Sequence, residues 1–225
     1  MNKTFKSFSE KIFKCNKCDR LVNFRNQVSR KKRKSFKNQT YWNKPVSGFG
    51  DYKAKIILVG LAPAAHGATR TGRVFTGDKS ANFLFKCLFK AGLCNQSNSD
   101  HINDGLKLYN TFITLALRCV PPQDKPNSDE LKNCSKFFKQ ELNMINNKKV
   151  IVALGKIAFD TCIKFYKKNF NITGTFKFEH GKSYKINDII VIGCYHPSPR
   201  NVNTKKIDIP KMVNVFKIAK KISAN

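Results

Sequence analysis

The sequence has 225 residues, of which 41% are hydrophobic, so it is long enough to bury one sizeable core. No run of eighteen apolar residues and no Gly/Ser/Pro-rich linker occurs. This composition excludes a transmembrane helix, and we expect one cytoplasmic domain over residues 1–225. The net charge of +29 favours a polyanionic partner, nucleic acid before an anionic membrane surface. An AT-rich genome would also favour lysine over arginine, but it does not explain why only 14 acidic residues occur.

The N-terminal segment, residues 1–50, carries the first two cysteines. A short amphipathic helix is predicted over residues 5–13, and Cys15 and Cys18 follow it as a CxxC pair. In a reducing compartment such a pair indicates a metal site or a redox pair, and no strand precedes it as a thioredoxin-like turn requires. A second helix is expected from residue 19 into the basic block 30–34. That block is either a phosphate contact or a solvated face.

Two further cysteines, Cys119 and Cys134, lie next to turn or helix-start signals. Four thiolates from two separated pairs can bind a tetrahedral zinc ion or a four-iron cluster, and the spacing does not choose between them. The alternative is that Cys119 and Cys134 are small buried hydrophobic residues. The remaining cysteines occur within apolar patterns and are assigned to the core: Cys87, Cys94, Cys162 and Cys194.

The chain is organised around residues 55–85. A β-branched run at 56–59 ends at Gly60, and a long loop then leads to an apolar-periodic helix. Three more buried strands are predicted at 112–117, 150–154 and 189–194. Helices are predicted at about 80–92, 129–146, 156–168 and 210–221. This alternation predicts an α/β three-layer sandwich, with a central four-stranded parallel sheet flanked by helices.

Three loops should meet at the carboxyl edge of this sheet: 61–79, 119–122 and 195–201. His196 follows a strand and precedes two prolines that restrict the loop, so it is either a held functional imidazole or a turn-capping residue. Phe75 lies between glycines, where it either stacks on a planar ligand or plugs the loop. Asp78 stands at a helix start, as an N-cap does. Asp78 and Asp124 are the only carboxylates in the candidate loops.

Several motifs occur in order along most of the chain: GLAPAAHGATRTGRVFTGD, CVPPQDKP and HPSPRNVNT, with CNKCDRLVNFR and YWNKPVSGFGD near the N-terminus. This set of motifs resembles the uracil-DNA glycosylase superfamily, and within it the type-B (family five) branch. The resemblance implies a four-stranded parallel sheet between helices and hydrolysis of the bond that joins a damaged base to deoxyribose. It also implies a [4Fe-4S] cluster held by Cys15, Cys18, Cys119 and Cys134.

The same resemblance implies a role for each site residue. His196 would donate a hydrogen bond to the base carbonyl, and Asp78 would position the attacking water, since Leu61 and Ala62 are apolar. The base pocket would comprise Gly60, Ala62, Phe75 and Asp124, and the DNA-facing loop would comprise Ser198, Arg200 and Asn201. The sequence departs from the branch at Asp124, where asparagine is common, and over residues 204–208, which replace a TGRLT-like continuation.

We therefore expect a monomeric, nucleoid-associated DNA repair glycosylase that excises uracil, with deaminated purines such as hypoxanthine as further candidate substrates. The alternative is a noncatalytic iron-sulfur or zinc protein that binds nucleic acid on the same fold. That alternative explains the charge and the cysteines, but it leaves His196 and the GLAPAAHG loop without a role.

Overall fold

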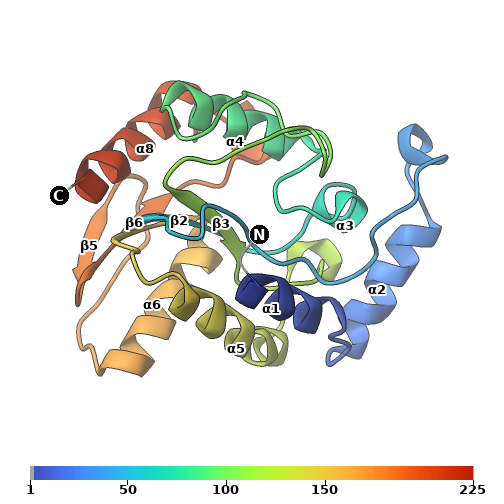
Figure 1. Cartoon of the computed structure of the whole chain (residues 1–225), viewed down its shortest axis with the longest axis horizontal. Coiled ribbons are helices and arrows are strands. Elements are labelled where there is room, and N and C mark those ends of the chain that lie inside the picture. The colour runs from blue at the N-terminus through green and yellow to red at the C-terminus, as the bar shows by residue number, and fades with distance from the viewer. Residues whose placement is uncertain (1–2, 225) are drawn as a thin grey trace.

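A computed structural model describes residues 3–224, and its centre is a six-stranded sheet with helices on both sides (Figure 1). The strand order is β1-β3-β2-β4-β6-β5. Four strands in the middle of the sheet are parallel: β2 (Ile56–Gly60), β3 (Thr111–Leu115), β4 (Val150–Leu154) and β6 (Ile189–Cys194). These are the four strands that the apolar runs predict.

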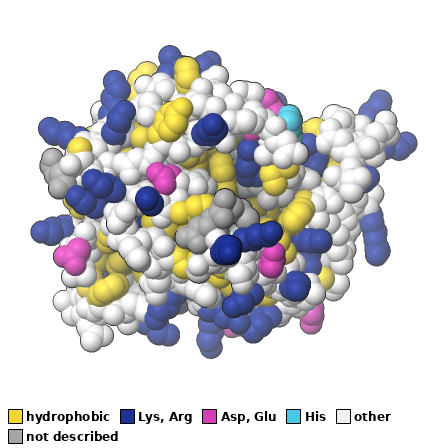
Figure 2. Space-filling view, in the orientation of Figure 1, with side chains coloured by type: hydrophobic (Ala, Val, Ile, Leu, Met, Phe, Trp, Pro, Cys, Tyr) yellow, Lys and Arg dark blue, Asp and Glu magenta, His cyan; other side chains and the backbone are white. Residues whose placement is uncertain are grey.

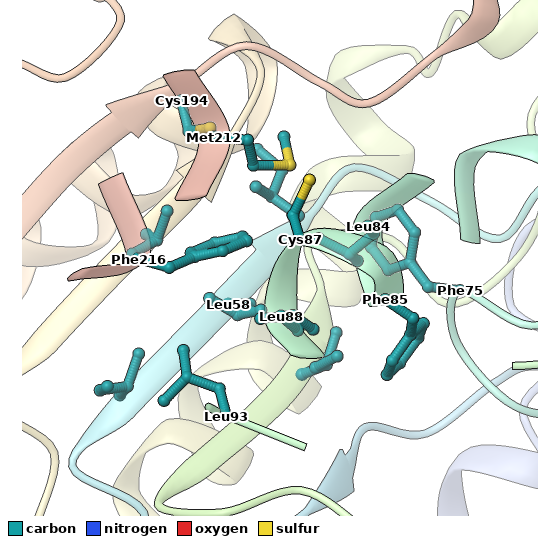
Figure 3. Packing of buried hydrophobic residues seen from close by; sticks show 14 of the residues in the cluster. Leu58, Phe75, Leu84, Phe85, Cys87, Leu88, Leu93, Cys194, Met212 and Phe216 are labelled. Carbon is teal, nitrogen blue, oxygen red and sulfur yellow. The ribbon is translucent and has the colours of Figure 1, made fainter. Parts of the chain in front are cut away.

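The central strands form because their β-branched residues can be buried on both faces. Leu58 of β2 pairs with Ile113 of β3 on one side and with Val152 of β4 on the other. Successive residues of β2 then enter different cores. Leu58 packs in the cluster formed with α4 (Lys79–Lys90) and α8 (Ile209–Ala224), as Figure 3 shows. Ile57 packs in the cluster formed with α5 (Ser128–Met144) and α6 (Lys156–Phe170).

Two antiparallel edge strands, β1 (Phe49–Gly50) and β5 (Ser183–Ile186), extend the predicted four-stranded sheet to six. Neither has the apolar run of a buried strand. β1 has only two residues, and three of the four residues of β5 are partly or fully exposed. Both strands form by pairing with a neighbouring strand that the core holds in place. Their own sequences therefore do not predict them.

The N-terminal segment contributes α1 (Lys3–Phe13) and α2 (Asp19–Arg30). Phe5 of α1 packs 4.1 Å from the ring of Tyr52, which fastens this segment to the body. The prediction that the second helix continues through the basic block is wrong, because α2 ends at Arg30. Like charges at helical spacing, such as Arg30 and Lys34, disfavour its continuation.

The loops carry four short helical turns: the 3₁₀ turns η1 (Lys34–Phe36) and η2 (Pro122–Asp124), and the α-helices α3 (Ala68–Thr71) and α7 (Pro199–Asn203). The four predicted core cysteines, Cys87, Cys94, Cys162 and Cys194, are all buried, which confirms that assignment. Within residues 3–224, no helix is both long enough and apolar enough to cross a membrane.

Candidate active site and cysteine cavity

A cavity of about 320 Å³ lies at the carboxyl edge of the parallel strands. Two of the predicted loops, 61–79 and 195–201, supply most of its walls. No residue of the predicted loop 119–122 lines it, although Asp124, just beyond that loop, does. Six of the predicted site residues line it: Ala62, Phe75, Asp78, Asp124, His196 and Ser198. Its volume is near the lower end of the roughly 300 to 1,000 Å³ typical of ligand pockets, which suits a small planar ligand.

His196 is the second residue after β6, and a hydrogen bond holds its backbone. Asn201 donates from Nδ2 to the His196 carbonyl oxygen at 2.9 Å. Gly155, which follows β4 with φ +101°, lies close enough that a Cβ there would be 3.5 Å from the His196 Cβ. Burial lowers the pKa of His196 to about 4, so the ring is neutral at pH 7. One ring nitrogen then carries a hydrogen that can be donated to a ligand oxygen.

Phe75 is both a wall of the cavity and part of the core. Its backbone has φ 48°, unusual for a large side chain, and the residue is 8% exposed. The ring lies 5.8 Å from the His196 ring, tilted by 34°. Gly60 makes this possible, because a Cβ there would be 2.9 Å from Phe75 Cε2. An aromatic face and a neutral imidazole therefore border the same space.

Asp78 caps α4, since its Oδ1 accepts a hydrogen bond from the Ala81 N–H at 2.9 Å, and the N-cap prediction is confirmed. Burial raises the pKa of this carboxyl, while backbone hydrogen bonds from Ala81 and Ser80 oppose the rise. Gly67 packs against the carboxylate so closely that any side chain there would collide with Asp78 Oδ2. The carboxylate is thus fixed at the cavity wall.

Asp124 borders the cavity from the exposed loop after β3. It and Gln123 both have φ 56°, two consecutive left-handed residues. Aspartate and asparagine tolerate this conformation better than most residues do. The backbone at position 124 therefore accepts aspartate as well as asparagine, and the two residues differ there only in the chemistry of their side chains.

The loop 198–201 divides into anchoring residues and a free one. Ser198 caps α7 by accepting from the Asn201 N–H at 3.3 Å, and Asn201 holds the His196 carbonyl. Arg200 is exposed, and its side chain forms no hydrogen bond or ion pair within residues 3–224. Of the three predicted DNA-facing residues, Arg200 is the one whose side chain is not engaged in a hydrogen bond within the loop.

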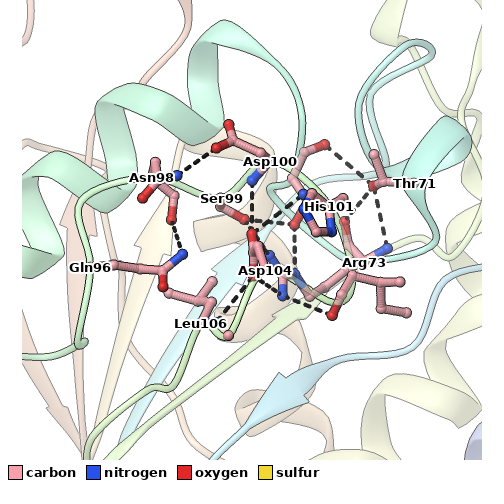
Figure 4. Close-up of polar contacts among 12 residues, drawn as sticks. Thr71, Arg73, Gln96, Asn98, Ser99, Asp100, His101, Asp104 and Leu106 are labelled. Carbon is pink, nitrogen blue, oxygen red and sulfur yellow. Dashed lines mark hydrogen bonds and ion pairs between the residues drawn. The ribbon is translucent and has the colours of Figure 1, made fainter.

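Sequence reasoning missed the residues that support this site. Arg73 is buried, and its guanidinium forms a bidentate ion pair with Asp104 at 2.6 and 2.9 Å (Figure 4). The same guanidinium donates to Thr76 Oγ1 at 2.9 Å and to Ser99 Oγ at 3.0 Å. This network supports the loop that carries Phe75 and Asp78. The only sequence signal was a basic residue in a glycine-containing loop, and its partner lies 31 positions away.

The two N-terminal cysteines, the cysteine of the loop after β3 and the cysteine of α5 do come together. Cys15, Cys18, Cys119 and Cys134 line one small cavity of about 20 Å³, between the start of α2, the loop after β3, and α5. Across residues 3–224, however, no three histidine, cysteine or acidic side chains converge as the ligands of a single metal ion. A bidentate ion pair of Arg20 with Glu130, both contacts at 2.7 Å, joins α2 to α5 beside this cavity.

The surroundings of the thiols fit an anionic group. Arg25 is only 6% exposed, and its Nη1 donates to Cys119 Sγ at 3.5 Å. Its buried Nε has no partner, and no ion pair to Arg25 occurs within the described part of the chain. Asn133 donates to Cys18 Sγ at 3.6 Å. A buried cation without a carboxylate is costly, and bound thiolates would offset that cost.

The fold and the site together define the class of this protein. It is an α/β protein with a central parallel sheet and a pocket at the carboxyl edge of that sheet. An aromatic ring, a neutral histidine and a fixed carboxylate form the walls of this pocket, which suits a small planar ligand.

Residues 47–220 match the uracil DNA glycosylase superfamily, and the chain belongs to that family. Two type-5 uracil-DNA glycosylases are similar to it along more than nine tenths of their own length. The one from Pyrobaculum aerophilum is 38% identical over 96% of this chain and 92% of its own. The one from Thermus thermophilus is 37% identical over 96% and 97%. A type-4 uracil-DNA glycosylase from Sulfurisphaera tokodaii is 30% identical over 91% and 80%.

Proposed function

We propose that this chain is a uracil-DNA glycosylase, which hydrolyses the N-glycosidic bond of uracil in DNA and leaves an abasic site. The observation that carries the proposal is the cavity in which Phe75, His196 and Asp78 face one space. We expect uracil to be the main substrate, and the deaminated purine hypoxanthine is a further candidate. The protein is proposed to act as a monomer.

The first requirement of this chemistry is access to the base. A glycosylase must take the target base out of the stack, which costs a few kcal/mol, and a pocket with an aromatic face offsets part of that cost. Phe75 supplies such a face. Its position is fixed by the close packing against Gly60, so little side-chain entropy is lost when the base enters.

Bond cleavage places negative charge on the departing base and positive charge on the sugar. A neutral His196 can donate its ring N–H to the base carbonyl oxygen, where this negative charge develops. The depressed pKa keeps the ring neutral at physiological pH, so the donor stabilises the charge without transferring its proton. The Asp78 carboxylate would orient the attacking water and stabilise the cationic sugar.

A single-turnover assay on a uracil-containing duplex tests this assignment. Wild-type protein should release uracil, and His196→Ala should lose about 3 to 4 kcal/mol of transition-state stabilisation, as removal of one oxyanion donor does. Substrate binding should change little. Absence of an abasic product from the wild-type protein would overturn the proposal and favour the noncatalytic alternative.

We also propose that Cys15, Cys18, Cys119 and Cys134 hold a [4Fe-4S] cluster. The donor set and the uncompensated guanidinium of Arg25 support this proposal. Such a group, when bound, would join the N-terminal segment to the connection between β3 and α5. Protein purified without oxygen should contain iron and acid-labile sulfide in equal amounts and absorb broadly near about 400 nm.

Cysteine substitutions separate this cluster from a chance grouping of thiols. Cys18→Ala should lose iron and stability, and any folded remainder should keep its rate for the chemical step. Cys94→Ala removes a buried core cysteine outside the cavity and should keep the iron content of the wild type. Colourless protein with one zinc ion would contradict the cluster.

A further inference from the structure

The segment after α2 forms a basic projection that the fold of the sheet does not need. We define the basic arm as residues 31–39, which stand out from the body beyond α2 and next to α3 in Figure 1. Five of its nine residues are basic: Lys31, Lys32, Arg33, Lys34 and Lys37. No acidic residue occurs from position 20 to position 50.

The charges of the arm face solvent and are not neutralised. Lys31, Arg33 and Lys34 are exposed, and no ion pair involves a residue of the arm anywhere in the part of the chain described. In Figure 2 lysine and arginine side chains gather at this extremity of the molecule. A cluster of unpaired cations on a narrow projection is complementary to a phosphate backbone, and binding of a polyanion relieves its self-repulsion.

The arm is nevertheless seated firmly at its base. The Arg70 guanidinium lies 3.9 Å from the centroid of the Phe36 ring, and its Nη1 donates to Gln39 Oε1 at 2.6 Å. Tyr41, which follows the arm, shares a hydrogen bond of 2.8 Å with His66 Nδ1. These contacts fix the arm to the loop 61–79 instead of leaving it as a free tail.

Arg70 also reaches the loop that carries the catalytic carboxylate. Its Nε donates to the His66 carbonyl at 2.8 Å, and its Nη2 donates to the Gly77 carbonyl at 2.6 Å. Gly77 immediately precedes Asp78. One guanidinium therefore joins the base of the arm to the backbone beside Asp78, with every nitrogen engaged.

We propose that the basic arm binds phosphates of duplex DNA that flank the target nucleotide, and that Arg70 and Phe36 hold the arm in register with the base pocket. This inference rests on the proposed function, because it takes DNA as the partner. In this proposal residues 31–39 bind the DNA backbone independently of the DNA sequence, whereas the pocket recognises the base. Arg70 would be a positioning residue, since it acts through the arm and the loop.

Salt-dependent binding to an undamaged duplex tests the arm without requiring catalysis. The arm variant is Lys31→Gln/Arg33→Gln/Lys34→Gln. Because each phosphate contact contributes about 0.9 to the slope of log K against log salt, three lost contacts should flatten the slope by about 2 to 3. The matched control is Lys164→Gln/Lys168→Gln/Lys221→Gln, which removes three exposed lysines from the C-terminal halves of α6 and α8, at the opposite edge of the sheet. It should leave the slope within about 0.5 of the wild type.

Phe36→Ala tests the seat of the arm, because it removes no charge. It should weaken binding to the duplex with a smaller change of slope than the arm variant shows, and binding equal to wild type would overturn the role of Phe36. An arm variant with the wild-type slope, or a control that loses as much, would overturn the DNA assignment. The DNA assignment would also be overturned if the arm variant lost binding to phosphatidylserine vesicles but kept the wild-type salt slope for DNA. The absence of uracil release alone would overturn only the proposed activity, because these measurements use undamaged DNA.

Discussion

His196 has an environment that should be visible in the pH dependence of stability. Its pKa is lowered by burial to about 4, whereas an ordinary histidine in the unfolded chain has a pKa near about 6.5. Between these values the unfolded chain binds a proton that the folded chain does not. The stabilising contribution of the neutral ring is therefore complete above about pH 6.5 and falls as the pH decreases toward 4.

We predict that wild-type protein loses about 1 to 2 kcal/mol more stability between pH 7 and pH 5 than His196→Gln does, because glutamine does not titrate. Urea unfolding at the two pH values measures both losses. The comparison removes the contribution of other titrating groups, which the two proteins share. Equal losses in the two proteins would show that His196 does not titrate as a buried neutral ring.

Asp78 has two possible tasks, and two substitutions distinguish them. Asn and Ser both retain an oxygen that caps α4 through the Ala81 N–H, but both remove the charge that would orient water. We predict that Asp78→Asn and Asp78→Ser melt within a few degrees of wild type, since capping survives, yet lose at least about 100-fold in single-turnover rate. If both variants kept the wild-type rate, Asp78 would be only a helix cap. Backbone groups or Asp124 would then have to position the water.

At the scale of elements, the loop that carries Phe75 and Asp78 depends on a buried ion pair. Burial alone would raise the pKa of Asp104, but hydrogen bonds from Arg73 and from the Leu106 and Asp100 N–H groups outweigh it and lower that pKa to about 2. Both side chains are less than a tenth exposed. Removing one partner leaves the other as an uncompensated buried charge.

We predict that Asp104→Asn lowers the free energy of unfolding by about 3 to 5 kcal/mol, as breaking a buried pair does. The rate of the folded fraction should also fall, because Thr76 and Ser99 share the same guanidinium. Asp160→Asn is the control. It breaks the exposed Lys156–Asp160 pair and should cost less than about 0.5 kcal/mol. A loss for Asp104→Asn as small as that of the control would rule out a supporting role for the ion pair.

The elements that sequence predicted well are those with a strong local signal. The apolar runs predicted β2, β4 and β6, and Asp78 predicted the start of α4. Both signals consist of adjacent residues, since a strand buried on both faces is a continuous apolar run and an N-cap directly precedes its helix. β5 and the break after Arg30 were missed, since pairing at a sheet edge and charge repulsion depend on neighbours in space. For the same reason the sequence indicated Asp78 and His196 but not Arg70 or Arg73. The partners that give these two arginines their roles, Gln39 and Asp104, each lie 31 positions away.

At the scale of the whole molecule, a net charge of +29 makes electrostatic repulsion a general feature of the fold. The described residues form six ion pairs, of which three lie between exposed partners and contribute little. Most basic side chains therefore face one another across solvent without a compensating acid. Self-repulsion of this kind destabilises the compact state, and salt screens it over about 10 Å at 0.1 M.

We therefore predict that the melting temperature of the free protein rises as sodium chloride increases from about 20 mM to about 500 mM, because screening relieves more repulsion than attraction. Binding to DNA should weaken over the same range, since released counterions drive it. The two measurements thus have opposite signs in one protein. A short duplex at low salt should raise the melting temperature as added salt does, because it neutralises charge and binds only the folded state. A melting temperature that falls with salt would mean that the ion pairs, and not the excess of lysine and arginine, dominate the electrostatic free energy of the fold.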